Sequence, residues 1–275
     1  MSEPVSSPRQ SLLSGAGLLL LLWGSSFALS VLWPTAVAEH CPLGKDVLRP
    51  DRSVCELAFG GTWISLSIGL LAGAAATLVG LLVASLARGL GRWIDAALMR
   101  SADALFALPD VLVLMVLQFA AQTAADLHPR LRIGPVPLMV ASLAMVGWAA
   151  PARQFRDRLD TLERAEFVGA AHALGAGRWH LFGWHLWPFL RDYVLAVFLA
   201  RVPAAILAES TVSFLGIGKV EPMSLGRYLG TSYASLLHGE GARVVLPAWL
   251  LLILIVIGAT LAGRGASALA ARPQL

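Results

Sequence analysis

Between Glu56 and Arg88 the sequence reads LAFGGTWISLSIGLLAGAAATLVGLLVASLA (residues 57–87), a run that contains no charged side chain. A helix needs about 20 apolar residues to cross the hydrocarbon core of a bilayer, so this run is long enough to span a membrane. Small residues recur along it at four-residue intervals: Ala72, Ala76, Gly80 and Ala84. This ridge favours close helix packing, either within the chain or against a second, similar chain.

The composition of the whole chain agrees with a membrane protein. Of its 275 residues 57% are hydrophobic and 14% are charged, and the mean hydropathy is +0.71. Soluble domains have roughly 25% charged residues, so we expect a protein that crosses the membrane several times and is surrounded by lipid. The net charge is +4, but the basic residues are scattered over short loops, and we expect no nucleic-acid partner.

The charge-free runs predict an all-α membrane protein with six transmembrane helices. Three further runs lack charges: those between Arg9 and Glu39, between Arg132 and Arg153, and between Arg243 and Arg264. Two more contain a single charge: Ala104 to Ala125 with Asp110, and Tyr193 to Ala208 with Arg201. The predicted organisation is a cytoplasmic N-terminus over 1–10, a membrane domain over 11–265 and a cytoplasmic C-terminus over 266–275.

The first span could instead be a secretory signal, because Ala36, Val37 and Ala38 resemble a cleavage site. Its apolar part is too long and its leading charge too weak, so we expect it to stay in the protein. Placing the N-terminus inside puts the larger share of arginines on inner loops, which favours both termini in the cytoplasm. Cys41 and Cys55 then share an outer loop, where a disulfide and two free thiols are both open.

The longest cytoplasmic segment, residues 151–191, begins as an amphipathic helix. Apolar residues recur at helical spacing: Phe155, Leu159, Leu162 and Ala165. Charged residues step along another face: Arg156, Asp160 and Arg164. We expect the apolar stripe to lie against the membrane domain and the charged face to stay exposed.

We expect this helix to end near Leu174, because Gly175 and Gly177 supply the left-handed conformations that helix ends commonly use. A second short helix would run from Arg178 to Trp187. Pro188 suits the first turn of the next span, where its missing N–H is not needed.

The turn is shaped for close approach by another protein, since Ala171 and Gly175 have almost no side chain. An ordinary cytoplasmic turn has the same pattern. Three histidines also suggest a metal site: His172, His180 and His185. Their spacings do not place all three on one helix face and no cysteine is near, so we expect hydrogen-bonded or solvated histidines and no metal.

The segment resembles the cytoplasmic "EAA" loop of the permease subunits of bacterial ABC importers. Ala170 and Ala171 are followed by Gly175 and, thirteen residues beyond it, by Pro188, with His185 three residues before the proline. Gly169 replaces the glutamate of the motif and Trp187 replaces its usual leucine, so an ionic contact from the glutamate position is not expected.

Two other stretches resemble the dipeptide, oligopeptide and nickel branch of these permeases, the "C" type. AESTVSFLGIG (208–218) matches the Ala-Glu-x-x-x-Ser-Phe-Leu-Gly-x-Gly pattern of that branch. HCPLGKDVLRPD (40–51) is similar to a His-Pro-Leu-Gly-Thr-Asp segment, although Cys41 is extra and Lys45 replaces threonine. Asp46 and Asp51 keep their spacing. The resemblance covers the chain from about residue 10 to its end.

The resemblance implies a MetI-like permease fold and no enzymatic activity in this chain. It implies four partners: a homologous permease subunit in a heterodimer, two ABC ATPase domains, and an external solute-binding protein. The inner loop would be a coupling helix seated on an ATPase, with contacts from Ala170, Ala171, Leu174, Gly175, Ala176, Arg178, His185 and Pro188. The chain lacks a phosphate-binding Gly-x-x-x-x-Gly-Lys-Ser/Thr loop, so ATP and Mg²⁺ would bind to the ATPases and no cofactor to this chain.

Arg201 falls within an expected span, where an arginine costs roughly 2.5–3.5 kcal/mol and should face a cavity or a carboxylate. We hypothesise that Arg201 lines the translocation path with Asp110 and Glu209 and meets a substrate carboxylate. The alternative is an ion pair with Asp110, with Glu209 or with a partner subunit.

The expected function is import of di- or oligopeptides across the bacterial inner membrane, with nickel or a metal chelate as the alternative cargo. A secondary transporter would need an internal inverted repeat or several intramembrane ionisable groups, and the sequence has neither. An intramembrane hydrolase would need a nucleophile and a base at matching depth, but no histidine lies in a span.

Overall fold

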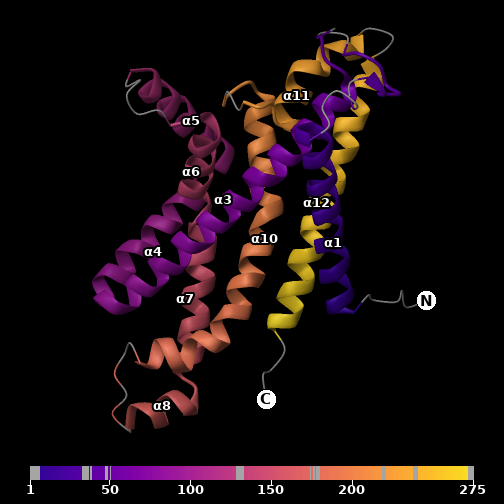
Figure 1. Ribbon diagram of the computed structural model, residues 1–275. Helices are drawn as coiled ribbons and strands as arrows, with labels where there is room; N and C mark the ends of the chain where they lie inside the picture. The colour runs from indigo at the N-terminus through magenta and orange to yellow at the C-terminus, as the bar shows by residue number, and fades with distance from the viewer. Residues whose placement is uncertain are drawn as a thin grey trace, which may run out of the picture.

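The computed structural model describes residues 7–32, 37, 39–46, 49, 51–127, 133–173, 175, 177, 180–218, 221–237 and 241–271 of the protein. Its elements in chain order are α1 (Pro8–Phe27), η1 (Ala28–Leu32), α3 (Val54–Leu90), α4 (Arg92–Phe106), α5 (Asp110–Leu127), α6 (Pro135–Gly147), α7 (Ala149–Glu163), α8 (Glu166–Ala173), η2 (Leu181–Leu186), α10 (Trp187–Phe214), α11 (Leu225–Ser232), η3 (Tyr233–Leu237) and α12 (Gly241–Ala270). The elements form an all-α bundle in which α3 runs diagonally across the others (Figure 1).

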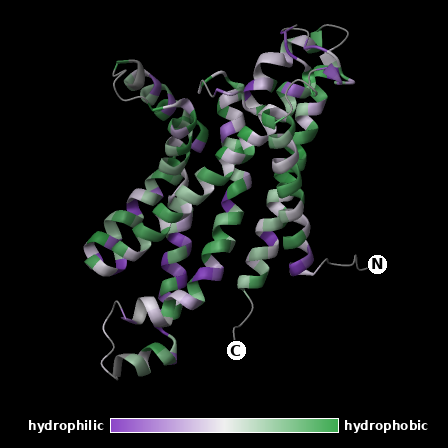
Figure 2. Ribbon diagram, viewed as in Figure 1, coloured by the Kyte–Doolittle hydropathy of each residue, from purple (hydrophilic) through white to green (hydrophobic). Residues whose placement is uncertain are grey.

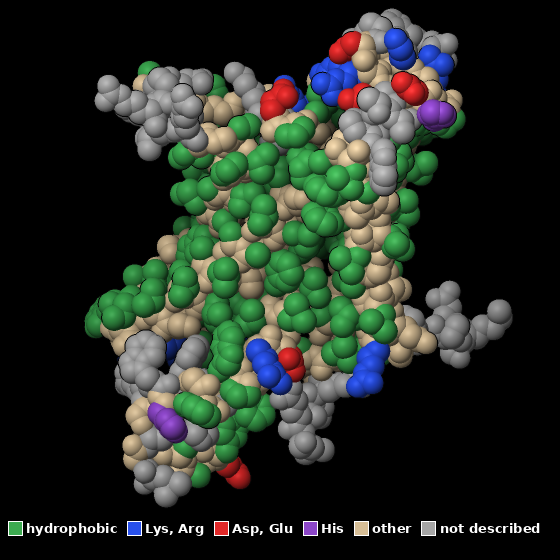
Figure 3. All heavy atoms as spheres, viewed as in Figure 1, with side chains coloured by type: hydrophobic (Ala, Val, Ile, Leu, Met, Phe, Trp, Pro, Cys, Tyr) green, Lys and Arg blue, Asp and Glu red, His purple; other side chains and the backbone are tan. Residues whose placement is uncertain are grey.

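Four helical segments of the described chain are individually long and apolar enough to cross a membrane: Pro8–Leu32, α3, α10 and α12. Two bent pairs raise the number to six, because α4 with α5 and α6 with α7 each satisfy the same test together. Apolar residues dominate the middle of these helices in Figure 2. The space-filling view has an apolar belt, with charged side chains gathered towards its two ends (Figure 3). The predicted six-span arrangement therefore corresponds to four single helices and two bent pairs.

The expected third span, Ala104 to Ala125, is wrong at its start. The chain breaks between Phe106 and Asp110, and α4 meets α5 at 98°. Pro109 accounts for the break, since the residue before a proline is biased away from the helical conformation. The preceding segment forms α4, a separate helix that the charge-free runs did not predict.

The cytoplasmic helix expected to run to Leu174 is also broken, and it ends as α7 at Glu163 before α8 begins at Glu166. The turn lets Leu162 and Val168 enter the same apolar cluster, which one straight helix would separate. The end of α8 at Ala173 agrees with the expected end near Leu174. The expected short helix over 178–187 is replaced by η2, which leads directly into α10 with Pro188 in its first turn.

The small-residue ridge of α3 packs within this chain. Ala72, Ala76 and Ala84 are buried, and Gly80 lies against α7. A Cβ atom at Gly80 would stand 2.6 Å from Cβ of Pro151 and 2.8 Å from the backbone nitrogen of Ala152. On a neighbouring line, Gly69 and Gly73 lie against Ile206 and Val202 of α10. The open alternative of packing on a second chain is therefore not needed to explain the ridge.

Gly80→Ala should destabilise the protein, because the new methyl group would force α3 and α7 apart. Overpacking of this kind typically costs about 1–3 kcal/mol, so we expect a lower thermal unfolding midpoint in detergent, followed by tryptophan fluorescence. Gly89→Ala is the matched control on the same helix, since no atom lies within 4 Å of its Cβ position. Equal midpoints for the two variants would contradict the close approach of α3 and α7.

Candidate functional site

One end of the molecule, where α1 begins and α12 ends, has an arm made of α7, α8, η2 and the start of α10. Its core is an apolar cluster that includes Phe155, Leu159, Leu162, Val168, Ala171, Leu186 and Leu190. The predicted apolar stripe is confirmed for Phe155 (0% exposed), Leu159 (2%) and Leu162 (7%), whereas its fourth residue, Ala165, lies beyond the end of α7 and is half-buried. We call α7, α8 and η2 the coupling arm; it lies at the same end of the bundle as both chain ends (Figure 1).

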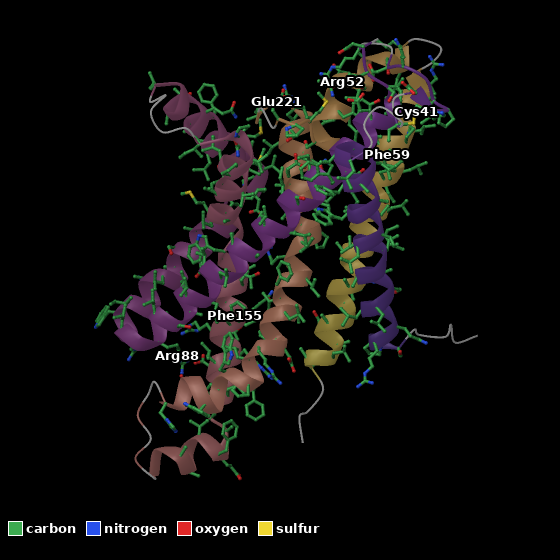
Figure 4. All side chains as sticks on the ribbon, in the orientation of Figure 1. Cys41, Arg52, Phe59, Arg88, Phe155 and Glu221 are labelled. Atoms are coloured by element: carbon green, nitrogen blue, oxygen red, sulfur yellow. A yellow bond between two sulfur atoms is a disulfide. The ribbon has the colours of Figure 1, made fainter. Side chains whose placement is uncertain are left out.

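The sequence predicted that the charged face of α7 stays exposed. In the structure, charged residues of this helix instead form ion pairs that hold the coupling arm against α3 and α4. Arg156 forms two bonds to Asp95 of α4, with Nε at 2.8 Å from Oδ1 and Nη2 at 2.6 Å from Oδ2. Arg88 of α3 pairs with Asp160 and Glu163. Figure 4 labels Arg88 and Phe155 on this side of the molecule.

A third connection joins Arg153 of α7 to Asp103 of α4, and its guanidinium lies 4.6 Å from the ring centre of Phe106. Sequence reasoning missed all of these connections. The basic residues of α7 were visible, but their acids lie on α4, a helix that was itself not predicted.

The turn after α8 has the conformation that its glycine predicts. Gly175 has φ 84°, in the left-handed region, and nothing lies within 4 Å of its Cβ position. The same expectation is wrong for Gly177, which is not among the described positive-φ residues. One left-handed residue is enough to end a helix, so Gly177 does not need this conformation.

Ala171 does not form the exposed small ridge that was expected. It is 8% exposed and belongs to the apolar cluster of the coupling arm, because that side of α8 faces α7. Gly169 and Ala170 are the exposed small residues of α8. Among the other predicted coupling residues, Leu174, Ala176 and Arg178 lie outside the described residues, and so does the side chain of His185.

Two exposed aromatic side chains lie on the coupling arm, one before and one after Gly175. Trp184 of η2 is 77% exposed and stacks on His180 with ring centres 6.2 Å apart. Phe167 of α8 is 38% exposed and stacks on Phe189 at 5.3 Å. Small exposed residues together with exposed aromatic rings are typical of a surface that another protein covers.

The structure does not bring the three residues predicted for the translocation path together in one site, although Asp110 is near enough to Arg201 to act on it electrostatically. Glu209 is fully buried, Asp110 is exposed at the start of α5, and Arg201 lies half-buried in the middle of α10. No ion pair joins any two of them within the described part of the chain. Glu209 therefore does not line a path in this chain.

Glu209 instead accepts hydrogen bonds from three serine hydroxyl groups of α3 and α10, and from the hydroxyl group of Ser224 just before α11. Ser65 of α3 donates at 3.2 Å, Ser210 at 3.3 Å and Ser213 at 2.7 Å. The oxygen of Ser65 also accepts the backbone N–H of Leu225 at 3.0 Å, at the start of α11. This network ties α10 to α3 and to α11.

The opposite end of the molecule is a compact cap around α11. Cys41 and Cys55 form a disulfide, which resolves the two alternatives left open by the sequence. Asp46 is 2% exposed and accepts a hydrogen bond at 3.1 Å from the hydroxyl group of Tyr228. Burial, with the Asp46 carboxylate next to it, raises the pKa of Tyr228 above its usual range, so that the hydroxyl stays a donor.

A cleft of about 340 Å³ opens beside this cap. It is lined by Arg49, Asp51, Arg52, Glu56, Leu57, Gly60, Gly61, Glu221, Pro222, Met223 and Arg227. Arg52 bonds to Glu56 at 2.7 Å and Arg227 to Glu221 at 2.9 Å, so charges of both signs are paired around the opening (Figure 4). The described residues contain no group of three or more metal-binding side chains, here or elsewhere.

Comparison with known proteins finds relatives that match most of the chain. Residues 76–273 match the family model described as binding-protein-dependent transport system inner membrane component. The dipeptide transport system permease protein DppC of Bacillus subtilis is 27% identical over 257 residues, covering 88% of this chain and 76% of the relative.

Two further relatives carry similar names. The oligopeptide transport system permease protein OppC of Mycobacterium tuberculosis is 27% identical over 266 residues, covering 90% of this chain and 85% of the relative. A protein of Brucella abortus whose name describes a peptide permease is 30% identical over 195 residues, which is 71% of this chain. The match spans 59% of the Brucella protein's length.

Glu209→Ala should destabilise the protein more than Glu209→Gln. The alanine variant leaves these buried hydroxyl groups without their acceptor and opens a cavity, at a cost of about 2–4 kcal/mol. Glutamine keeps one acceptor oxygen in place and should cost about half as much. The readout is the thermal unfolding midpoint in detergent, with the exposed Thr123→Ala on α5 as control. A Glu209→Ala variant as stable as this control would contradict a structural role for the network.

Proposed function

Because the chain belongs to the family of binding-protein-dependent transport system inner membrane components, we propose that it is a permease subunit of an ATP-driven peptide importer. The names of its relatives from Bacillus subtilis and Mycobacterium tuberculosis support peptides as the cargo. In this role the chain carries out no covalent chemistry. It provides part of a path through the membrane and changes conformation when its partners hydrolyse ATP.

The observation that carries this proposal is the coupling arm. It presents Gly169 and Ala170 on the exposed face of α8 and Gly175 in the turn after it, which leaves room for the surface of another protein. It is also fixed to α3 and α4 through Arg88, Arg156 and Arg153. A force applied to the turn would therefore reach the membrane helices rather than bend a loose loop.

The proposed partners follow from this arrangement. An ATPase domain would cover the turn from the cytoplasm, and a second, homologous permease subunit would bring a second ATPase. A solute-binding protein would deliver the peptide at the opposite end, where the disulfide-closed cap lies. ATP and Mg²⁺ would be held by the ATPases. Both chain ends lie at the end of the coupling arm (Figure 1), so both termini would be cytoplasmic in the bacterial inner membrane.

The test compares two arginine substitutions placed at opposite ends of the molecule. Ala170→Arg adds a large charged side chain to the exposed face of α8, whereas Thr231→Arg adds the same group to the exposed face of α11. Each tagged variant would be purified in mild detergent, its co-purifying proteins identified by mass spectrometry, and the complex reconstituted into vesicles with a labelled tripeptide and ATP.

We expect the wild type and Thr231→Arg to retain a P-loop ATPase and a second permease, and the wild type to take up peptide only with ATP. Ala170→Arg should lose the ATPase and the uptake while its unfolding midpoint stays unchanged, because Ala170 is outside the apolar cluster. A wild type that purifies alone, or that takes up peptide without ATP, would overturn the proposal.

A further inference from the structure

Arg201 is a charged residue of the membrane domain that has no hydrogen-bond or ion-pair partner among the described residues. It lies near the middle of α10, about 21 Å along the helix from Trp187 at roughly 1.5 Å per residue. Its Nε atom is buried and has no hydrogen-bond partner. Among the described residues, no hydrogen bond or ion pair reaches any other atom of its guanidinium group.

The space around Arg201 is made by small residues of two neighbouring helices. A Cβ atom at Gly147, where α6 ends, would stand 3.0 Å from Nη2 of Arg201 and 3.2 Å from Cβ of Ala76. Any side chain at position 147 would therefore crowd the guanidinium. Next to Arg201 on α10, Val197 belongs to the apolar cluster of the coupling arm and Ala205 to the cluster between α3 and α6.

No carboxylate of the described residues forms an ion pair with Arg201. Glu209 lies two turns further along α10 and is occupied by its serine hydroxyl groups. Asp110 is near enough to act on Arg201 electrostatically, but it is exposed at the start of α5 and lies beyond ion-pair distance. A buried arginine without a carboxylate is costly, so the site has a free energy of binding to gain from an anion that arrives.

We propose that Arg201 is a carboxylate-binding residue on the translocation path, and that its ligand is the C-terminal carboxylate of the transported peptide. The proposal rests on the proposed function, because that function supplies the ligand. A carboxylate is the group that guanidinium recognises with two parallel bonds. Every peptide with a free C-terminus carries a carboxylate, whatever its sequence. The residues around Arg201 are apolar and small, so they do not select among the side chains of the peptide.

The half-buried position of Arg201 favours a transient ligand over a fixed partner group. This chain already encloses Nε, so an anion has access only to the remaining part of the side chain. A peptide terminus is small enough to enter and leave from that side in each transport cycle. A carboxylate of the second permease subunit would instead form a permanent ion pair, whose loss would weaken assembly.

The experiment measures ATP-dependent uptake of labelled tri-alanine and of its C-terminal amide by the complete complex in vesicles. The variants are Arg201→Gln, which removes the charge, and Arg201→Lys, which keeps it. Arg191→Gln is the matched control, since it removes an exposed arginine from the same helix. The same binding protein is used throughout, so that its own preference multiplies every acid-to-amide ratio equally.

We expect Arg201→Gln to lower tri-alanine uptake by about tenfold or more, as the loss of a charge-assisted contact predicts. Amide uptake should be unaffected, so the acid-to-amide ratio falls. Arg201→Lys should recover part of the tri-alanine uptake, and Arg191→Gln should match the wild type. Two other roles of Arg201 are distinguished by the same set: binding of a lipid phosphate would leave the acid-to-amide ratio unchanged, as would a role in packing.

Three results would overturn the proposal. The first is an unchanged acid-to-amide ratio in Arg201→Gln. The second is loss of the second permease subunit from purified Arg201→Gln, which would assign Arg201 to that interface. The third is recovery of tri-alanine uptake in the double variant Asp110→Asn with Arg201→Gln, which would show that Arg201 only balances Asp110. A wild-type complex that takes up neither peptide would instead reject the proposed function.

Discussion

The structure depends on how closely the helices can approach α3. Lipid chains are as apolar as leucine, so helices in a membrane gain little by hiding apolar side chains from their surroundings and must gain by close contact instead. Gly80 brings α7 against α3, and Gly69 and Gly73 bring α10 against it. Both the coupling arm and α10 therefore pack against α3.

Polar groups then fix the register that close packing permits. Within the apolar belt, Glu209 accepts hydrogen bonds from hydroxyl groups of α3 and α10. Ser65 in turn accepts a hydrogen bond from the first residue of α11. In the coupling arm, Arg156 and Asp95 hold α7 to α4 with two bonds. Arg201 differs from both, because it is the intramembrane charge whose guanidinium is unmatched within the described chain. That contrast separates structural charges from a charge available to a ligand.

The sequence predicted the features that depend on local chemistry. Charge-free runs located the membrane helices because a charge inside lipid is costly. Gly175 predicted the turn, and the spacing of Phe155, Leu159 and Leu162 predicted the buried face of α7. The motif around residues 208–218 identified the family, although it did not reveal that Glu209 is enclosed rather than exposed to a path.

What the sequence did not predict depends on pairs of distant residues. Asp95 and Arg156 are 61 positions apart, and only the bend before Asp110 brings α4 beneath α7. Asp46 and Tyr228 are 182 positions apart and meet only because the cap folds over α11. Ala171 was misassigned for a similar reason, since the break between α7 and α8 decides which side of α8 faces the cluster.

The arrangement of α6 and α7 connects the two ends of the proposed mechanism. Gly147, the last residue of α6, lies against Arg201. After Trp148 the chain continues as α7, the first helix of the coupling arm, which makes an angle of 48° with α6. The ion pairs of α7 to α3 and α4 make the arm move with those helices rather than alone. A displacement imposed on the arm by an ATPase would therefore act on the helix end that borders Arg201. A change of about 1 Å there would alter the fit of a bidentate carboxylate, since such bonds weaken steeply with distance and angle. Coupling and release of the cargo would then share one element, the junction of α6 and α7.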